Sequence, residues 1–442
     1  MGRSGWVSCC LLLAIGCGGS SDDASAGAGD GDTGGASSRP TGTGGGAQPG
    51  STNAGGMNSG ETSGTTGTTS GSGGVGGGAG AKGGSSGTGG IADAGQPDAP
   101  HTVGSCSGLG TPGTWELISP PAWKSSAMNE ALSVAVDPEN PSIVFAAAGD
   151  KTNGGSGGTG IHKSTDCGAT WMKISTGAHG ADLETGDTWE LKMDPTDPQV
   201  MYATNGYGSP PSLFKSMNGG VDWEILVPDG GALAKAAGGN FVQGFSMDPT
   251  DSKHLVLTFH FNCTGTFAPM CMAETKDGGT TWRAFKGPTS GWSEGAAPIV
   301  LGSNTWLYAT GSALYYTKDG ATSWEKVSSN GGGGLYRAKD GTMFLGGDGG
   351  MLQSKDGYAW SQVPNAPRAS GVLGDGTNLY AVFQNDYSGQ PFHTAKESDP
   401  TKWSQVQTPT IKQGGGSLAY DPDHRVLYGA CWGAGLWRGV TQ

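Results

Sequence analysis

The sequence has no apolar run long enough to cross a membrane as a stable helix and no stretch with sustained helical periodicity. Its apolar stretch from Trp6 to Ile15 has about half of the roughly 20 residues that a spanning helix needs. Basic clusters are missing too, and 38 acidic residues outnumber 25 basic ones, so we expect no nucleic-acid partner. Zinc-type pairs of Cys or His and EF-hand loops are absent, so we expect no metal and no cofactor.

The first residues have the features of an export signal. A single positive charge, Arg3, precedes the short apolar stretch, which ends Leu13-Ala14-Ile15-Gly16-Cys17. This ending resembles the lipobox of a bacterial lipoprotein, with Ala14 where Leu is usual. The resemblance implies a signal peptide over 1–16, diacylation of Cys17, and anchoring to the bacterial outer membrane or cell surface through the lipid alone. An ordinary secretory signal is the alternative, and either one takes the protein out of the cytoplasm.

Behind Cys17, Gly, Ser, Thr and Ala dominate the composition as far as Ser105. Few aromatic or branched apolar residues occur there, so folding would bury too little surface to offset the lost chain entropy. We predict a disordered linker over 17–105 that holds the folded part away from the anchor, with a glycosylated stalk as the alternative. Residues 106–442 then form one large folded domain.

A short repeat organises the folded domain: a hydroxyl residue, an acid two positions later, then glycine, a second hydroxyl and tryptophan. The acid can accept backbone hydrogen bonds in a tight turn, and the glycine permits a conformation closed to other residues. The tryptophan brings a large apolar area to the next strand, so each repeat indicates a β-hairpin. Full copies end at Trp171, Trp223, Trp282 and Trp324, and shortened or decayed copies end at Trp360 and Trp403.

This repeat resembles the Asp-box, or bacterial neuraminidase repeat, of sialidases, xyloglucan-cleaving glycoside hydrolases and sortilin-type receptors. Seven copies of a second pattern, an apolar strand, a turn and another apolar strand, alternate with the boxes. The seventh, Leu418–Tyr428, has no box after it, whereas Thr114–Ile118 looks like an outer strand without a blade. We therefore predict an all-β fold: a seven-bladed β-propeller with four-stranded antiparallel blades, closed by pairing the two ends of the domain.

The two faces of this propeller are expected to differ. Asp-Pro turns and boxes connect strands on one face, and the long irregular segments emerge on the opposite face, where binding residues concentrate. Those segments carry carboxylates with Trp and Tyr, which suit a sugar because they offer hydroxyl acceptors and flat apolar surfaces. The candidate ligand-binding residues are Asp182, Glu184, Asp187, Tyr207, His260, Trp292, Glu294, Asp386, Tyr387 and Trp432.

The enzyme families that share the repeat fit this chain unequally. The arginine motif that sialidases place before the first box is missing, and sialidases have six blades. Seven blades and Asp-Pro turns resemble the xyloglucanases, but those enzymes cleave between two propellers with one catalytic carboxylate from each. We therefore expect a monomeric binding module for a glycan or a surface protein, with no catalytic residue assigned. The alternative is a glycoside hydrolase or a polysaccharide lyase, for which His260 or a tyrosine is the best candidate base.

The cysteines of the folded domain suit an oxidising compartment. Cys263 and Cys271 flank one loop and are expected to form a disulfide. Cys106 precedes the closing strand and Cys167 lies in the turn of the neighbouring blade, so these two can also pair. Cys431 would then remain as a free thiol.

Overall fold

The computed structural model describes residues 92–93, 103–125, 130–149, 160–228, 231–238, 241–293 and 296–442. These residues all belong to one compact unit of the chain. The predicted signal peptide, Cys17, nearly all of the predicted linker and the candidate residue Glu294 lie outside the described residues.

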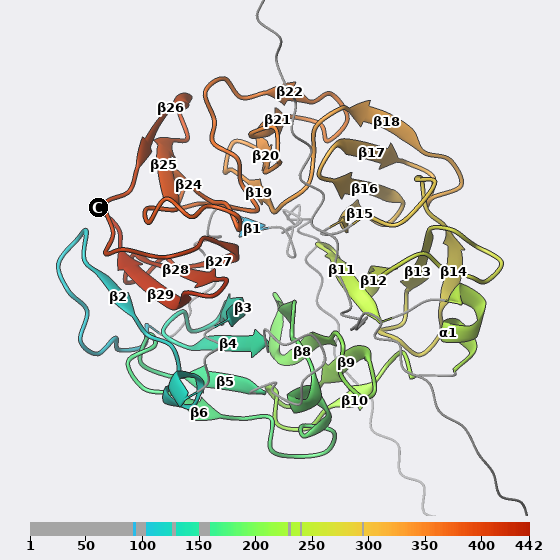
Figure 1. The fold of residues 1–442 in the computed structure, drawn as a ribbon, viewed down its shortest axis with the longest axis horizontal. Coiled ribbons are helices and arrows are strands. Elements are labelled where there is room, and N and C mark those ends of the chain that lie inside the picture. The colour runs from blue at the N-terminus through green and yellow to red at the C-terminus, as the bar shows by residue number, and fades with distance from the viewer. Residues whose placement is uncertain are drawn as a thin grey trace, which may run out of the picture. The chain divides into compact units, whose positions relative to one another are not determined.

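The strands of the described residues form seven sheets, which are arranged as blades around a common centre (Figure 1). Each blade has four antiparallel strands that follow one another outward from the centre, and the prediction of a seven-bladed propeller is confirmed. Blade 1 consists of β3 (Glu130–Val136), β4 (Val144–Gly149), β5 (Ile161–Ser164) and β6 (Met172–Lys173), and blade 2 consists of β7 (Leu191–Asp194), β8 (Asp197–Asn205), β9 (Ser212–Ser216) and β10 (Glu224–Ile225). Blade 3 consists of β11 (Val242–Asp248), β12 (Asp251–Phe259), β13 (Cys271–Thr275) and β14 (Arg283–Lys286), and blade 4 consists of β15 (Ala297–Gly302), β16 (Thr305–Thr310), β17 (Ala313–Thr317) and β18 (Glu325–Ser328). Blade 5 consists of β19 (Leu335–Arg337), β20 (Met343–Leu345), β21 (Leu352–Ser354) and β22 (Ser361–Gln362), and blade 6 consists of β23 (Gly371–Gly374), β24 (Asn378–Val382), β25 (Phe392–Lys396) and β26 (Asp399–Gln405). Blade 7 consists of β27 (Gly415–Asp421), β28 (Val426–Cys431), β29 (Gly435–Val440) and β2 (Trp115–Leu117).

Blade 7 combines strands from the two ends of the domain. β2 pairs antiparallel with β29, and Trp115 lies opposite Gly439 in this register. A Cβ atom at Gly439 would lie 2.5 Å from the indole, so glycine makes room for Trp115 there. The indole packs 4.6 Å from the Phe392 ring of blade 6, and Glu116 forms a 2.7 Å ion pair with Arg438. The predicted closure of the ring is therefore confirmed.

The turns between the third and fourth strands of blades 1 to 5 share one hydrogen-bond pattern. In blade 3 the Asp277 carboxylate accepts bonds from the Thr275 hydroxyl at 2.8 Å, and from the amide and hydroxyl of Thr281 at 2.8 and 2.6 Å. Gly279 has a φ of 102°, and its carbonyl accepts the indole N–H of Trp282 at 3.0 Å. The local sequence therefore fixes the turn. The same acceptor role recurs at Asp166, Asn218, Asp319 and Asp356.

The hydrophobic core lies between neighbouring blades. Between blades 1 and 2, for example, Phe145 and Ala147 of β4 pack in one cluster with Met201 of β8 and Phe214 of β9. The box tryptophan Trp223 belongs to the same cluster and is 3% exposed, so it extends this core toward the outer strand.

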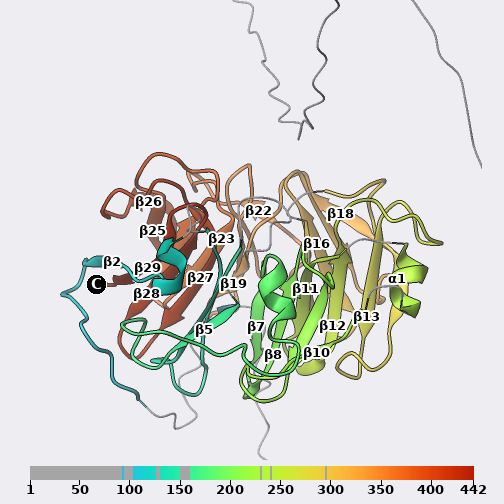
Figure 2. The same cartoon turned by 60° about the horizontal axis from the view of Figure 1, so that its bottom comes forward.

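The helices of the described residues are short. α1 (Ala232–Ala237) lies beside β14 (Figure 1) on the outer rim (Figure 2), and the 3-10 helices η1 (Pro121–Ser125) and η2 (Asp182–Thr185) lie in links between blades. α1 falls in a segment expected to be a Gly-rich loop; its alanines favour helix, and Gly238 with a φ of 53° ends it. Among the described helices, none has the length and apolar character to cross a membrane.

A further strand, β1 (Ala92–Asp93), lies inside the segment predicted as a linker. It pairs in parallel with β19, with Ala92 opposite Tyr336. Since β19 is the innermost strand of blade 5, its second edge faces the centre of the ring and can accept backbone hydrogen bonds. These two residues form a short paired stretch within the predicted linker, most of which lies outside the described residues.

Two disulfides join cysteines among the described residues. Cys263–Cys271 closes the loop between β12 and β13, and Cys106–Cys167 links the segment before β2 to the box turn of blade 1. Cys431, at the end of β28, is a free and fully buried thiol whose pKa burial raises.

Candidate functional site

A cavity of about 880 Å³ lies at the centre of the ring. Its wall is formed by the innermost strands, including Val134 of β3, Leu191 of β7, Ser246 of β11 and Ser417 of β27. The other lining residues lie on links between blades and on loops between second and third strands, all on the face opposite the boxes, which we call the loop face. The cavity therefore opens among the irregular segments on which the sequence placed the binding residues.

A continuous row of aromatic rings lies at this mouth, and we call it the aromatic arc. Neighbouring rings have centroids between 4.4 and 6.5 Å apart, distances at which aromatic side chains pack favourably. The rings lie on loops of blades 7, 2 and 3 and on the links that precede blades 2, 3 and 4. In spatial order the arc consists of Trp432, Trp189, Tyr207, Phe241, His260, Trp292 and Phe261.

Backbone geometry and hydrogen bonds hold the arc in place. Tyr207 and Phe261 have φ values of 56° and 63°, in the left-handed region that bulky residues rarely adopt. Trp292 donates its indole N–H to the Gln243 side chain at 2.5 Å and its amide N–H to Asn262 at 2.7 Å. Strained backbone of this kind concentrates at binding sites, where the surrounding structure maintains it.

Polar groups surround the arc on the remaining wall of the cavity. Gln243 and Gln384 are half-buried there, and Asn385 is exposed. Across the cavity, the links of blades 4 and 5 contribute glycines, with Gly332 and Gly333 at φ values of 87° and 102°. The mouth therefore has an aromatic side and a glycine side, with amide groups available to donate and accept hydrogen bonds.

The ionised residues of the described lining neutralise one another. Lys192 forms a 2.9 Å ion pair with Glu190, donates to the Phe245 carbonyl and lies 4.6 Å over the Phe245 ring. Glu190 also accepts the amide N–H of Phe245 at 3.1 Å. Asp348, at the rim, lies 3.7 Å from Arg368, with both side chains more than half exposed. The interior therefore presents little net charge to a ligand.

The structure separates the predicted aromatic residues from the predicted carboxylates. Tyr207, His260 and Trp432 line the cavity, and Trp292 contacts His260 with ring centroids 4.6 Å apart. The carboxylates are engaged elsewhere on the loop face: Asp182 accepts from His179 at 2.8 Å and Glu184 pairs with Lys173 at 2.6 Å. Asp187 is buried and its backbone pairs with Gly206, Asp386 accepts the Ser388 amide, and Tyr387 is 67% exposed.

Three rings of the arc, Trp189, Phe241 and Phe261, were not among the sequence candidates. Trp189 and Phe241 lie just before the inner strands β7 and β11, and Phe261 lies just after β12. The signal that could have found them is position: aromatic residues adjoin the same ends of the first and second strands in neighbouring blades. Sequence reasoning favoured long loops instead and so passed over residues at strand ends.

No protein-family model and no curated protein matches this chain. Solved structures do resemble it. The WD40 repeats of RRP9 share 10% identity with a TM-score of 0.50, and the match covers 74% of this chain and 98% of that one. PorZ from Porphyromonas gingivalis, described as a surface component of the type-IX secretion system, shares 14% identity with a TM-score of 0.49, covering 71% of this chain and 46% of that one.

A GH74 xyloglucanase from Xanthomonas campestris also resembles the chain. It shares 14% identity with a TM-score of 0.31, and the match covers 71% of this chain and 59% of the xyloglucanase. At identities this low the likeness is one of fold. The comparisons therefore place this chain among β-propellers and leave its ligand to be argued from its own residues.

Proposed function

We propose that this protein is a glycan-binding module of the bacterial surface, a lipid-anchored Asp-box propeller that holds its ligand on the aromatic arc. The observation that carries the proposal is the arc itself, a row of seven rings at the mouth of a cavity of about 880 Å³. Flat apolar rings beside hydrogen-bonding amides are what the alternating C–H and hydroxyl surfaces of a sugar require.

The charge of the site narrows the ligand class. An acidic sugar would need a free cation, but the Lys192 ammonium is already bound by Glu190 and the Phe245 carbonyl. A neutral oligosaccharide needs no such partner, and the side-chain amides of Gln384 and Asn385 can bond its hydroxyls. We therefore assign neutral glycans as the ligand class.

Binding without cleavage is the version of this function that the described carboxylates favour. A glycosidase needs two carboxyl groups facing each other across the sugar, one of them free to donate a proton. Glu190 is held by the Lys192 ammonium and the Phe245 amide, and Asp182 and Glu184 bond to other side chains of the chain. Hydrolysis remains the alternative, and it would appear in the binding experiment as release of new reducing ends.

The location belongs to the same proposal. The lipobox ending at Cys17 and the Gly/Ser-rich segment behind it support a lipid anchor and a spacer at the outer membrane or cell surface. Cys17→Ser should abolish partition into the detergent phase. A variant that still enters that phase would show that the anchor lies elsewhere.

The binding proposal is tested with the purified protein on an array of neutral and acidic glycans, followed by titration of the best neutral oligosaccharide. Trp292→Ala and Trp189→Ala should each weaken binding at least about tenfold, because each removes a ring of the arc. Tyr358→Ala is the matched control, since this exposed tyrosine lies in the box of blade 5 on the opposite face. Absence of glycan binding, or equal loss in the control, would overturn the proposal, and a protein captured through the same tryptophans would favour a protein partner.

A further inference from the structure

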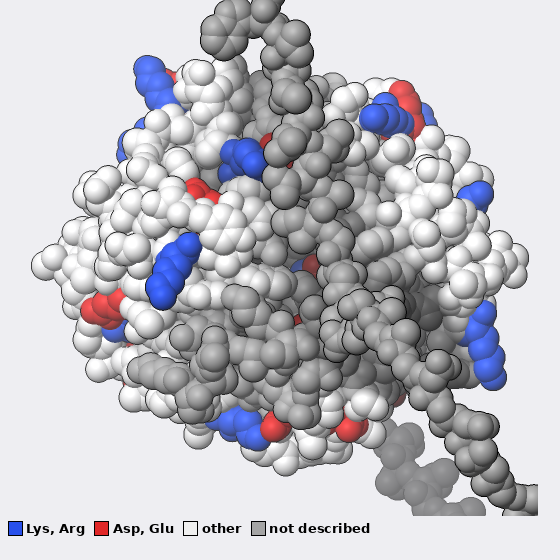
Figure 3. Space-filling model, viewed as in Figure 1, with Lys and Arg blue, Asp and Glu red and all other residues white. Residues whose placement is uncertain are grey.

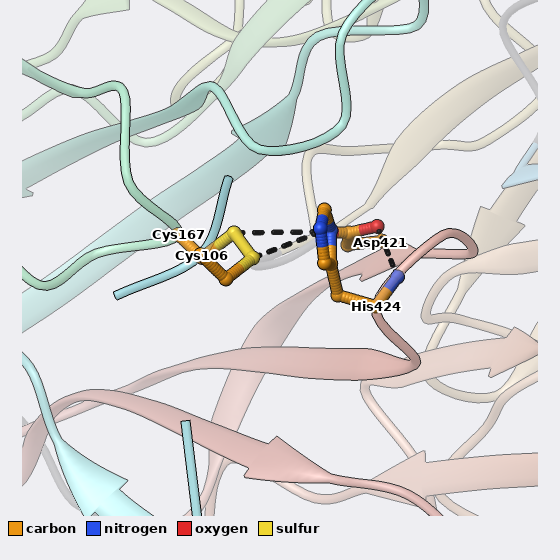
Figure 4. A group of neighbouring side chains, drawn as sticks. All are labelled: Cys106, Cys167, Asp421 and His424. Carbon is orange, nitrogen blue, oxygen red and sulfur yellow. Dashed lines mark hydrogen bonds and ion pairs between the residues drawn. A yellow bond between two sulfur atoms is a disulfide. The ribbon is translucent and has the colours of Figure 1, made fainter. Parts of the chain in front are cut away.

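Four side chains with metal-binding atoms meet where the ring closes. Cys106 lies in the segment before β2, Cys167 lies in the box turn of blade 1, and Asp421 and His424 lie in the turn between β27 and β28 of blade 7 (Figure 4). One ligand atom from each of the four lies within 4.8 Å of all the others. In this structure the two sulfurs are joined in a disulfide.

Asp421 is the centre of this group. Its side chain is fully buried, and its Oδ1 accepts the amide N–H groups of Asp423 at 2.9 Å and His424 at 3.0 Å. Its Oδ2 faces the His424 Nδ1 at 2.8 Å, the Cys167 Sγ at 3.6 Å and the Cys106 Sγ at 3.8 Å. Disulfide sulfurs carry no proton, so neither of them can donate a hydrogen bond to this carboxylate oxygen.

The hydrogen bond at the second ring nitrogen of His424 fixes which nitrogen carries a proton. Its Nε2 lies 3.1 Å from the Gly104 carbonyl, which can only accept, so Nε2 carries a proton and Nδ1 is turned toward Asp421. Metal-binding histidines have this arrangement, with one nitrogen donating to a backbone carbonyl and the other free for the ion.

Blade 3 also places a histidine beside the aspartate between its first two strands, but no four-residue group of ligand atoms forms there among the described residues. There Asp248 Oδ2 also meets a histidine Nδ1, that of His254 at 2.8 Å, but the other ring nitrogen faces the Glu274 carboxylate at 3.0 Å. The second disulfide, Cys263–Cys271, is not part of any such group of His, Cys and carboxylate atoms among the described residues. Thiols, imidazole and carboxylate therefore meet in the described part of the chain at the ring closure.

We propose that the reduced form of this cluster binds one zinc ion through Cys106, Cys167, His424 and Asp421. Two thiolates, one imidazole and one carboxylate form a four-coordinate set that suits Zn²⁺. Ligand atoms at about 2.0–2.3 Å from a tetrahedral ion lie roughly 3.3–3.8 Å apart, close to the present sulfur–oxygen distances. Binding requires the two bonded sulfurs to separate to such a distance and Nδ1 and Oδ2 to move apart from 2.8 Å.

The step needs a reductant, and a trialkylphosphine supplies it. The phosphine takes one oxygen from water and becomes the phosphine oxide, while the S–S bond breaks and each sulfur receives one proton. Zn²⁺ then forms two Zn–S bonds as the two thiol protons leave, and any proton held between Nδ1 and Oδ2 leaves with them. In a cell a dithiol would do the same by thiol–disulfide exchange and would itself become a disulfide.

The consequence concerns the closure of the ring. The disulfide ties the segment before β2 to blade 1, and a zinc ion on the same sulfurs would tie both to the β27–β28 turn. The domain would thus remain closed in both redox states, with the ion replacing the covalent bond. This inference does not depend on the glycan ligand.

The experiment compares the reduced full chain with a matched variant. Zinc binding is measured by titration after phosphine reduction, and Co²⁺ serves as a spectroscopic probe because thiolate coordination gives intense charge-transfer absorption. The parent should bind one zinc more than Cys106→Ser/Cys167→Ser, and His424→Gln should weaken that site at least about tenfold. Zinc should also raise the melting temperature of the reduced parent.

Two controls distinguish this site from other thiols and histidines. Cys263→Ser/Cys271→Ser removes the other disulfide, and His179→Gln removes an exposed histidine on the loop face, so both should leave the site intact. Reduced parent that binds no more zinc than Cys106→Ser/Cys167→Ser would overturn the proposal. Zinc affinity unchanged by both His424→Gln and Asp421→Asn would also overturn it, because the ion would then be held elsewhere.

Discussion

The two faces of the propeller use the same residue types in opposite ways. On the box face, Trp282 donates its indole N–H to Gly279, and the left-handed positions include the box glycines and the small residues Cys167 and Ala321. On the loop face, the left-handed positions include the bulky residues Tyr207 and Phe261. Most polar groups of the box turns therefore bond within those turns, whereas the loop face has strained aromatic residues at the mouth of a cavity.

Surface charge does not mark a binding patch on the face that Figure 3 shows. Lys and Arg are scattered singly over the face seen in Figure 3, without a cluster of either sign among the described residues drawn there. Ion pairs such as Lys355–Asp340, at 2.7 Å between exposed side chains, contribute little individually. Stability therefore comes mainly from the repeated turns and the interfaces between blades. We assign ligand binding to the residues of the irregular segments on the loop face.

The largest test removes the closing strand. A truncation that begins after Leu117 loses β2 and Cys106 and leaves Arg438, which is 4% exposed, without its Glu116 partner. Loss of one disulfide alone costs about 2–5 kcal/mol, so we expect the melting temperature to fall by roughly 10 °C or the protein to aggregate. A truncation that begins after residue 102 is the control, because it keeps β2. Equal melting temperatures for the two truncations would contradict the closure.

A pair of tryptophans tests the division between faces directly. Trp223→Ala in the box of blade 2 should lower the free energy of unfolding by about 3–5 kcal/mol, because its 3% exposed indole fills the space between blades. Trp292→Ala in the aromatic arc should cost less, since Trp292 is only partly buried. Denaturant unfolding measures both. If Trp292→Ala destabilises as much as Trp223→Ala, the arc is part of the core and the glycan assignment weakens.

The fold could be predicted from the sequence because its signals are local and repeated. The Thr275–Trp282 turn, for example, is specified within eight residues by hydrogen bonds among those residues. The closure was predictable because Thr114–Ile118 was an outer strand without partners. By contrast, the two-residue strand β1 depends on the open edge of β19 in the assembled ring, which no local pattern reveals.

The site was predicted less well because it depends on distances between blades. Tyr207, His260 and Trp432 meet at the cavity, but acids on the same face pair with neighbours such as His179 and Lys173 at the surface. These acids form ion pairs with residues that become their neighbours only in the folded chain, so the sequence alone does not reveal the pairs. The sequence also did not predict the group of Cys106, Cys167, Asp421 and His424, because its members lie too far apart along the chain to form a motif.

A smaller test compares two serines. Ser216 in the box of blade 2 is 1% exposed and accepts the Gly220 amide at 2.9 Å, so Ser216→Ala leaves a buried N–H without its partner. We expect a loss of about 1–3 kcal/mol in the free energy of unfolding. Ser388→Ala on the loop face should stay within about 0.5 kcal/mol, because Ser388 is exposed. Chemical denaturation measures the free energy of unfolding of both variants. Similar losses in the two variants would contradict the difference between the faces.

The mildest expected effect is a pH dependence from buried histidines of blades 1 and 3. Burial alone lowers the pKa of His254, but hydrogen bonds and charges from Glu274 and Asp248 outweigh it and hold that pKa above its usual value of 6.5. A raised folded pKa contributes stability that is complete below pH 6.5 and is lost as pH rises through the folded value. His162 acts in the opposite direction, because burial lowers its pKa to about 4 and stability is lost as pH falls from 6.5 toward 4.

These opposing contributions place the maximum of stability near pH 6.5, and His254→Gln separates them. Burial raises the pKa of Glu274, but bonds from His254 and Arg283 reverse this and lower it to about 2, so its contribution is lost only below about pH 4.5. We expect the parent to lose stability above pH 6.5 at no more than about 1.4 kcal/mol per pH unit, since one proton is involved. In His254→Gln this alkaline decline should be absent while the acid-side decline from His162 remains. Denaturant unfolding of both proteins from pH 5 to pH 9 measures the difference. Parallel curves would show that His254 does not hold its proton between the two carboxylates, and the stabilising network of the box face would then be one of neutral hydrogen bonds.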